Sequence, residues 1–215
     1  MRNGIIEAIR RHKLIVILRG IAREKLIPLC EAMYRGGVRL VEVTYSADGR
    51  TDDRETADRI KMLAEHFAER MFIGAGTVLS KEQVALTRGA GGGFIISPDA
   101  NPEVIRATRE AGMVSMPGAL TPTEIQSAHT AGADFVKLFP VTGLGVSYIK
   151  AIRAPLSHIE MLAVGGIDLA NIGAFLATGI AGVGIASGIT DHKMIDAEDY
   201  DGIEALARRY AEAMM

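Results

Sequence analysis

The sequence of 215 residues predicts an α/β fold, a single (β/α)8 barrel over residues 1–215 with a short N-terminal helix. Two observations lead to this prediction. Short apolar segments typical of strands alternate eight times with segments that can form helices. Several of these strands are apolar on both faces, as in a parallel sheet that helices cover on both sides. An open doubly wound sheet is the alternative, but the turn at residues 18–22 lacks the glycine-rich pattern of that fold.

The apolar pattern predicts where individual helices and strands lie. Periodic apolar residues predict the first helix at residues 2–12, the second at 23–35 and the last at about 200–215. Glycines follow several expected helices, where they supply a left-handed C-cap, at Gly37, Gly91, Gly112, Gly132 and Gly179. The expected strands cover residues 14–18, 39–44, 72–74, 94–97, 114–116, 135–139, 161–164 and 182–186.

Capping signals mark where helices begin. Ser80 precedes one helix, Thr121 and Glu124 form a capping box, and Asp168 precedes another helix at Leu169. Residues 46–55 are polar and follow the second strand, on the rim where barrel active sites form. This segment is either a solvated loop or a substrate lid.

Composition excludes several classes of function. The net charge is −2 without a basic run, so we expect neither a nucleic-acid nor a membrane partner. The single cysteine, Cys30, and the absence of a signal-like N-terminus favour the cytoplasm. The five histidines are scattered without metal-ligand spacing, so we expect no metal.

Lys137 lies in the middle of an apolar strand, which is an unusual place for a charged side chain. It shares one face of that strand with Phe135 and Phe139. The lysine either reaches water from an edge strand or is desolvated. Desolvation lowers the pKa of an amine, and a neutral amine attacks carbonyl groups to form a Schiff base.

Glu42 is the acid that the second strand places on its inner face if Val41 and Val43 face the helices. It forms either a structural ion pair with Lys137 or Arg19, or a general acid/base beside the amine. Glycine-rich turns follow the last two strands, at Gly165–Gly166 and around Ser187. Loops at these positions of a barrel commonly bind phosphate, although they can also be simple tight turns.

Motifs along nearly the whole chain resemble those of the 2-keto-3-deoxy-6-phosphogluconate (KDPG) and 4-hydroxy-2-oxoglutarate (KHG) aldolases. These are class I pyruvate aldolases built as (β/α)8 barrels. The motifs are Ile-Leu-Arg at 17–19, Val-Glu-Val-Thr at 41–44, Gly-Ala-Gly-Thr-Val at 74–78, Ile-Ser-Pro at 96–98, Met-Pro-Gly at 116–118, Phe-Val-Lys-Leu-Phe-Pro at 135–140 and Val-Gly-Gly at 164–166.

The resemblance implies a role for each matching residue. Lys137 would form the Schiff base and Glu42 would transfer protons. Some members carry a carboxylate-binding arginine where this chain has Ser46, so Arg19 would serve the carboxylate. The remaining substrate-binding residues would be Thr77 and Pro98 in the pyruvate pocket, Gly165, Gly166 and Ser187 at the phosphate, and Val164 directly before the paired glycines.

The implied reaction cleaves KDPG to pyruvate and glyceraldehyde 3-phosphate, or 4-hydroxy-2-oxoglutarate to pyruvate and glyoxylate, without a cofactor. The resemblance also implies a homotrimer. Val164 is typical of the branch that acts on the phosphogalactonate epimer, so that aldolase is an alternative. Two further alternatives remain, a phosphate-binding barrel isomerase or synthase and a non-catalytic barrel that binds an effector.

Overall fold

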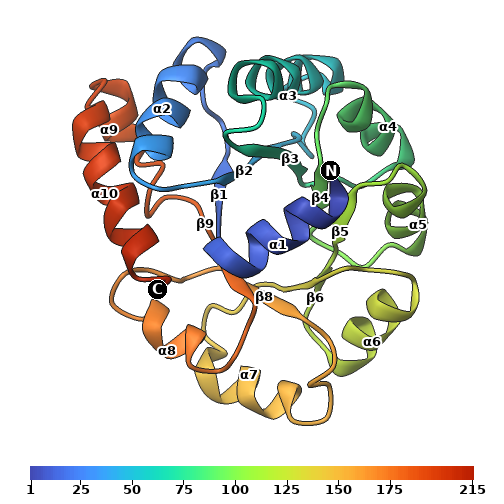
Figure 1. Cartoon of the computed structure of the whole chain (residues 1–215). Helices are drawn as coiled ribbons and strands as arrows, with labels where there is room; N and C mark the ends of the chain where they lie inside the picture. The colour runs from blue at the N-terminus through green and yellow to red at the C-terminus, as the bar shows by residue number, and fades with distance from the viewer.

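The computed structural model describes all 215 residues as a barrel of parallel strands surrounded by helices (Figure 1). The predicted (β/α)8 barrel is therefore confirmed. Neighbouring strands follow the order β5-β4-β3-β2-β1-β9-β8-β7-β6, and all paired strands are parallel. The strands are β1 (Leu14–Leu18), β2 (Leu40–Thr44), β3 (Phe72–Gly76), β4 (Phe94–Ile96), β5 (Val114–Met116), β6 (Gly118–Ala119), β7 (Val136–Leu138), β8 (Met161–Val164) and β9 (Gly182–Ile185).

The ninth strand arises where Pro117 divides one strand of the barrel into two. Pro117 has no N–H group and cannot donate to the hydrogen-bond ladder, so β5 ends before it and β6 begins after it. β5 pairs with β4, whereas β6 pairs with β7. The carbonyl of Pro117 still accepts a hydrogen bond of 2.8 Å from the N–H of Lys137. The two short strands together occupy the fifth position of the barrel.

Helices follow the strands and cover the outside of the barrel. The predicted capping box is present, because Thr121 and Glu124 each accept from the other's backbone N–H, and Ser80 accepts from the N–H of Gln83. No helix combines the length and apolar character needed to cross a membrane. The helices are α1 (Arg2–His12), α2 (Arg23–Arg35), α3 (Asp53–Phe67), α4 (Lys81–Gly89), α5 (Pro102–Glu110), α6 (Pro122–Thr130), α7 (Gly145–Arg153), α8 (Ile172–Leu176), α9 (His192–Asp196) and α10 (Tyr200–Glu212).

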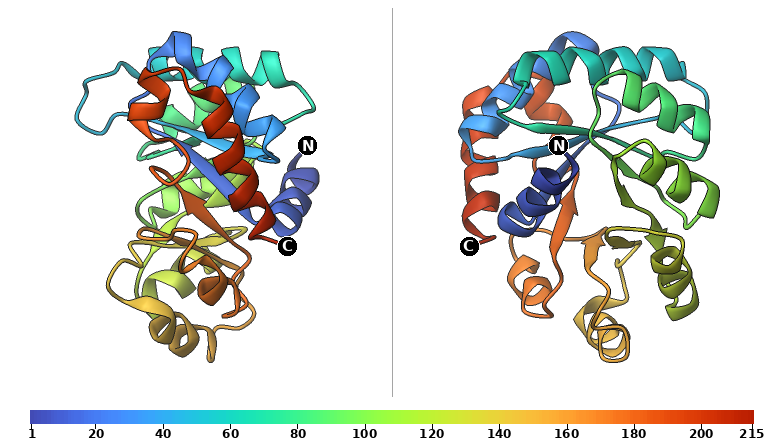
Figure 2. Two further views of the ribbon diagram at one scale, coloured as in Figure 1. Left: turned by 90° about the vertical axis from the view of Figure 1, so that its left-hand side faces the viewer. Right: turned by 45° about the vertical axis from the view of Figure 1, so that its right-hand side comes forward.

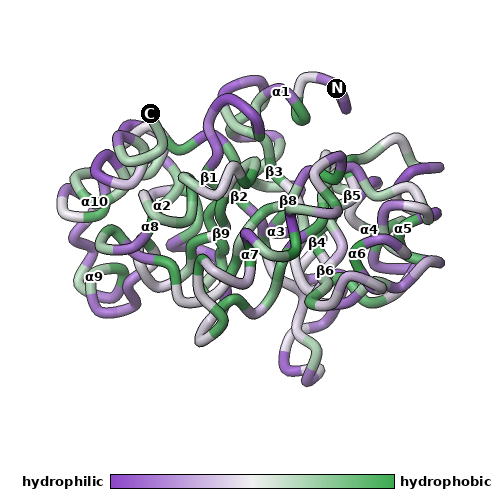
Figure 3. The backbone as a smooth tube through the Cα atoms, turned by 90° about the horizontal axis from the view of Figure 1, so that it is seen from below, coloured by the Kyte–Doolittle hydropathy of each residue, from purple (hydrophilic) through white to green (hydrophobic).

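Side chains of the strands alternate between two apolar clusters. The outer cluster lies between sheet and helices and includes Val41, Val43, Val136 and Leu138. The inner cluster includes Leu40, Phe94, Phe135 and Leu162, together with Ile5 and Ile9 from α1. Hydrophobic colour accordingly concentrates along the central strands in Figure 3, whereas the outer helices are mixed. The predicted inner and outer faces of β2 and β7 agree with this arrangement.

The two ends of the barrel differ in how they are closed. α1 lies across the end at which the strands begin, and Ile5 and Ile9 fill that end (Figures 1 and 2). The loop after β2 projects from the opposite end, where the strands finish (Figure 2, left). Because α1 fills one end, a substrate can enter the barrel only from the end at which the βα loops lie.

The structure corrects two local predictions. The polar segment predicted as a loop over residues 46–55 is shorter, because Asp52 caps α3 through the N–H of Arg54 and the helix begins at Asp53. Asp168 does not start a helix at Leu169. Its carboxylate instead accepts from the N–H groups of Ala170 and Asn171 in a turn, and α8 begins only at Ile172.

Candidate active site

Lys137 lies inside the barrel and not on an edge. β7 has a neighbour on each side, since Lys137 is in register with Gly118 of β6 and Leu162 of β8. The residue is only 6% exposed. Its Nζ lies 4.5 Å from the centre of the Phe139 ring. The alternative in which this lysine reaches water from an edge strand is therefore wrong.

Burial changes the proton affinity of the Lys137 amine. Desolvation lowers its pKa below the usual range, the Glu42 carboxylate opposes that change, and Arg19 adds to the lowering. A larger fraction of the amine is therefore neutral near pH 7 than for a lysine in water. A neutral amine is the form that can act as a nucleophile toward a carbonyl carbon.

Glu42 reaches the same interior from β2. It is 2% exposed, and burial raises the pKa of its carboxyl to about 6, although Lys137 and Arg19 oppose the increase. It forms no ion pair within hydrogen-bonding range, and its buried Oε2 has no hydrogen-bond partner. The predicted alternative of a direct structural ion pair is not seen. A carboxyl with this pKa can take up and release protons near neutral pH.

Glycine makes room for the Glu42 carboxyl. A Cβ at Gly76 would lie 2.5 Å from Glu42 Oε1, which is closer than real Cβ contacts. Gly76 is in register with Thr44 on the neighbouring strand, one inward position beyond Glu42. The carboxyl group therefore lies against bare backbone, where any larger residue would displace it.

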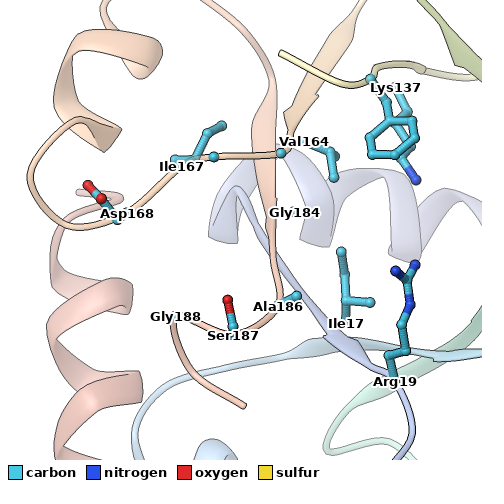
Figure 4. A pocket seen from close by; sticks show the side chains of 13 residues that line it. Ile17, Arg19, Lys137, Val164, Ile167, Asp168, Gly184, Ala186, Ser187 and Gly188 are labelled. Atoms are coloured by element: carbon cyan, nitrogen blue, oxygen red, sulfur yellow. The ribbon is translucent and has the colours of Figure 1, made fainter. Parts of the chain in front are cut away.

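Lys137 connects an inner cavity with the mouth of the barrel. The inner cavity, of about 10 Å³, is lined by Lys137 and Glu42 together with apolar neighbours such as Ile96 and Leu162. The mouth is a cavity of about 440 Å³. In Figure 4, Lys137 and Arg19 point toward each other across this opening, with Ser187 farther along it. Candidate residues that line the mouth are Arg19, Lys137, Val164, Gly165, Gly166 and Ser187.

The glycines after β8 adopt conformations that favour glycine. Gly165 and Gly166 have φ values of +104° and +70°. A Cβ on Gly166 would also lie 2.8 Å from Thr142 Oγ1. Backbone conformation and tight packing therefore explain why glycine occupies position 166, whether or not an anion binds there. Gly165 and Gly166 also line the mouth, so their peptide groups are available to a ligand there. Ser187, which follows β9, adds a hydroxyl to the same cavity.

Two predicted residues lie away from this opening. Thr77 lines a neighbouring cavity that it shares with Arg19 and has a positive φ of 57°, an uncommon and strained conformation for a β-branched residue. Pro98 follows β4 and lies against Gly118, whose Cβ would be 2.3 Å from the Pro98 carbonyl oxygen. Pro98 lines neither the mouth nor the inner cavity.

Sequence reasoning missed three residues near the site. Phe139 was placed on the same face as Lys137, and this alternation could have identified it as a neighbour of the amine. Asp168 lines the mouth, whereas its sequence context indicates only a helix cap. Arg59 lies on α3 and lines the cavity beside Arg19. No local pattern distinguishes Arg59 from Arg54, the other arginine of that helix.

The sequence pattern that describes KDPG and KHG aldolases matches residues 5–206. This chain belongs to the KDPG and KHG aldolase family. It is therefore an aldolase-family enzyme, and the fold expected for the family is the one observed. The predicted family resemblance is confirmed over nearly the whole chain.

Three similar proteins match most of this aldolase-family chain. A probable 2-dehydro-3-deoxy-6-phosphogalactonate aldolase from Rhizobium meliloti (strain 1021) is 39% identical over 177 residues, 82% of this chain and 81% of the relative. The structure of KDPG aldolase from Legionella pneumophila, with pyruvate captured as a covalent carbinolamine, is 26% identical, with a TM-score of 0.85 and 97% of each chain covered. A cube-shaped protein cage designed by fusing symmetric oligomeric domains is 32% identical, with a TM-score of 0.83, and 94% of this chain and 71% of that chain are covered.

Proposed function

We propose that this protein is a class I aldolase that uses Lys137 to cleave a 2-keto acid and release pyruvate. The observation that carries the proposal is the buried Lys137 amine, whose lowered pKa and shared cavity with Glu42 suit Schiff-base chemistry. The proposed substrates are KDPG, which yields pyruvate and glyceraldehyde 3-phosphate, and 4-hydroxy-2-oxoglutarate, which yields pyruvate and glyoxylate.

A specific observation favours the phosphogalactonate epimer as a second candidate substrate. Val164 lines the mouth of the barrel where the gluconate-specific branch often carries threonine. The Rhizobium meliloti relative carries the name of a phosphogalactonate aldolase. The two epimers differ only at C4, so both are split into pyruvate and glyceraldehyde 3-phosphate.

The proposed cycle uses Lys137 and Glu42 in sequence. Neutral Lys137 attacks the C2 ketone, and Glu42 transfers protons as the carbinolamine forms and loses water. The resulting iminium accepts the electron pair of the C3–C4 bond while the C4 hydroxyl loses its proton and becomes the aldehyde. The enamine that remains is protonated at C3. Water then releases pyruvate and restores the free amine.

The other residues would bind the substrate on either side of the reacting carbons. Arg19 and Thr77 would lie toward the carboxylate, and the backbone of Gly165 and Gly166 with Ser187 would lie toward the phosphate. Peptide N–H groups in glycine-rich turns are suitable donors to a phosphate. Asp168 adds a negative charge at the same opening, which repels an anion. The phosphate would therefore be held by hydrogen bonds from the peptide N–H groups rather than by net positive charge.

We also propose that the chain forms a homotrimer in the cytoplasm. The likeness to a cage assembled from symmetric oligomeric domains supports an oligomer. The 23.0 kDa chain should then sediment as a species of three times that mass. Sedimentation as a single chain at micromolar concentration would contradict the trimer.

The cleavage assay tests the proposed function directly. Protein treated exhaustively with EDTA should release pyruvate from KDPG, from its galactonate epimer or from 4-hydroxy-2-oxoglutarate, because the amine needs no metal ion. Activity that disappears with EDTA and returns with a divalent cation would contradict the mechanism. Comparing kcat/KM among the three substrates then identifies the preferred one.

A further inference from the structure

A second cavity lies beside the mouth of the barrel and carries several cationic groups. It has a volume of about 460 Å³ and opens between the ends of β1, β2 and β3. Arg19 lines both this cavity and the mouth that contains Lys137, so the two spaces adjoin. The polar residues that line it are Arg19, Thr44, Ser46, Asp48, Arg50, Thr51, Arg59 and Thr77.

Arg59 provides the most enclosed charge in this cavity. Its side chain is 18% exposed. One end of the guanidinium pairs with Glu55 at 2.6 Å, while Nη1 lies 3.5 Å from the carbonyl oxygen of Ile21, a long contact. Its buried Nε has no hydrogen-bond partner. Buried donors are normally satisfied, so Arg59 has a donor that the protein itself leaves unpaired.

Ser46 and Arg50 also line this cavity, but both are already paired within their own loop. Ser46 donates to the Asp48 carboxylate and so turns toward its own loop. Arg50 pairs with Asp48 at 2.8 Å, and its side chain is 86% exposed. Charges in water are strongly screened, so Arg50 adds little to the cavity. Arg19 and Arg59 are therefore the cations left to bind an anion.

We propose that Arg59 is a specificity-determining residue that, with Arg19, selects 2-keto compounds carrying a carboxylate. This inference rests on the proposed function of Lys137. In the proposed complex, the carboxylate bonded to C2 of the substrate would extend from the mouth toward the cavity that Arg19, Arg59 and Thr77 line. The planar guanidinium group is well suited to bind a carboxylate through charge-assisted hydrogen bonds. Arg59 thus compensates for the serine at position 46.

Borohydride trapping of the pyruvate imine measures this selection without requiring turnover. Arg59→Met removes the charge and retains the aliphatic stem, and Arg54→Met is the matched control on an exposed position of the same helix. The pyruvate concentration that gives half-maximal trapping should rise about ten-fold or more in Arg59→Met and less than about two-fold in the control. Trapping by uncharged methyl pyruvate should be equal in both variants.

Glu55→Gln provides a second test in the opposite direction. Glu55 competes for the Arg59 guanidinium, so its neutralisation should lower the half-saturating pyruvate concentration. Glu55 is half exposed, so this variant should fold. Where Arg59→Met fails to fold by circular dichroism, an unchanged value in Glu55→Gln overturns the inference.

The inference is also overturned if folded Arg59→Met traps pyruvate as well as the Arg54→Met control does. It is likewise overturned if Arg59→Met loses trapping by methyl pyruvate as strongly as it loses trapping by pyruvate. These outcomes differ from failure of the proposed function itself. In that case the unmodified protein would trap no pyruvate at Lys137, which overturns the proposed function and with it the carboxylate selection that rests on it.

Discussion

At the scale of single residues, the site depends on two buried groups whose proton affinities change in opposite directions. Burial lowers the pKa of the Lys137 amine and raises that of the Glu42 carboxyl to about 6. Both changes follow from the cost of placing a charge away from water. As a result, the pKa values of the amine and the acid lie closer together than they do in solution. Such a pair can exchange protons with a bound substrate near neutral pH.

Glu42→Gln tests the assignment of the acid. The amide retains the shape of the side chain but cannot exchange a proton, so kcat should fall by roughly 10²–10⁴-fold. In the unmodified protein, Glu42 is protonated below its pKa of about 6, so kcat/KM should fall as the pH drops through that value. Steady-state kinetics as a function of pH measures both effects, and the decline near pH 6 should disappear in the variant.

Circular dichroism and thermal unfolding provide the control for Glu42→Gln. The variant should remain folded, because Glu42 makes no ion pair whose loss would leave a charge unpaired. An unfolded variant would instead support a structural role. A folded variant with unchanged kcat would show that another group transfers the protons.

At the scale of elements, the turns after β8 and β9 form the end of the mouth where we propose that the phosphate binds. Ser187 is the best position at which to test it, because Gly166 has a positive φ and lies against Thr142, so any substitution there would also add strain. Ser187→Asp places a carboxylate at the exposed mouth, and Ser187→Asn is its uncharged control.

Ser187→Asp should reduce kcat/KM for a phosphorylated substrate by roughly 10²-fold or more relative to Ser187→Asn, since like charges repel at short range. Cleavage of 4-hydroxy-2-oxoglutarate should fall less, because its second carboxylate is bonded directly to C4 and it has no phosphate to lie beside residue 187. Equal losses for both substrates would indicate that Ser187 does not lie beside the phosphate.

Alternation along the strands made much of the site predictable. Successive side chains of a strand point to opposite faces of the sheet. The apolar neighbours of Lys137 and Glu42 therefore indicated correctly that both residues face the inside of the barrel. Other features depended on tertiary contacts. The division of one strand at Pro117 required knowing both of its neighbours, and Asp168 formed a local turn in place of a helix cap. Arg59 reaches the cavity beside the mouth only because α3 packs beside the loop after β1.

At the scale of the whole molecule, the barrel creates the environment that the chemistry requires. α1 fills one end with Ile5 and Ile9, so the interior is closed to water from that side. β2 and β7, far apart in the sequence, direct Glu42 and Lys137 into one small cavity. The repeated strand–helix pattern predicted this architecture. The size of the cavity could not be predicted, because it depends on how side chains from many strands pack together.

The central claim is that the folded barrel makes Lys137 a Schiff-base nucleophile. Pyruvate with borohydride should attach a carboxyethyl group to Lys137, which peptide mass spectrometry can locate. Lys137→Arg should abolish both labelling and cleavage, because a guanidinium stays protonated and cannot form an imine. Lys150→Arg, an exposed position on α7, should be labelled at Lys137 like the unmodified protein.

Protein unfolded in urea is the control for the role of the barrel, because its lysines are all in water and Lys137 should lose its selective labelling. In the folded protein, the account predicts one carboxyethyl group per chain, on Lys137. Absence of labelling, or labelling of another lysine while cleavage continues, would contradict the Schiff-base assignment and favour a phosphate-binding isomerase, a synthase or an effector-binding barrel.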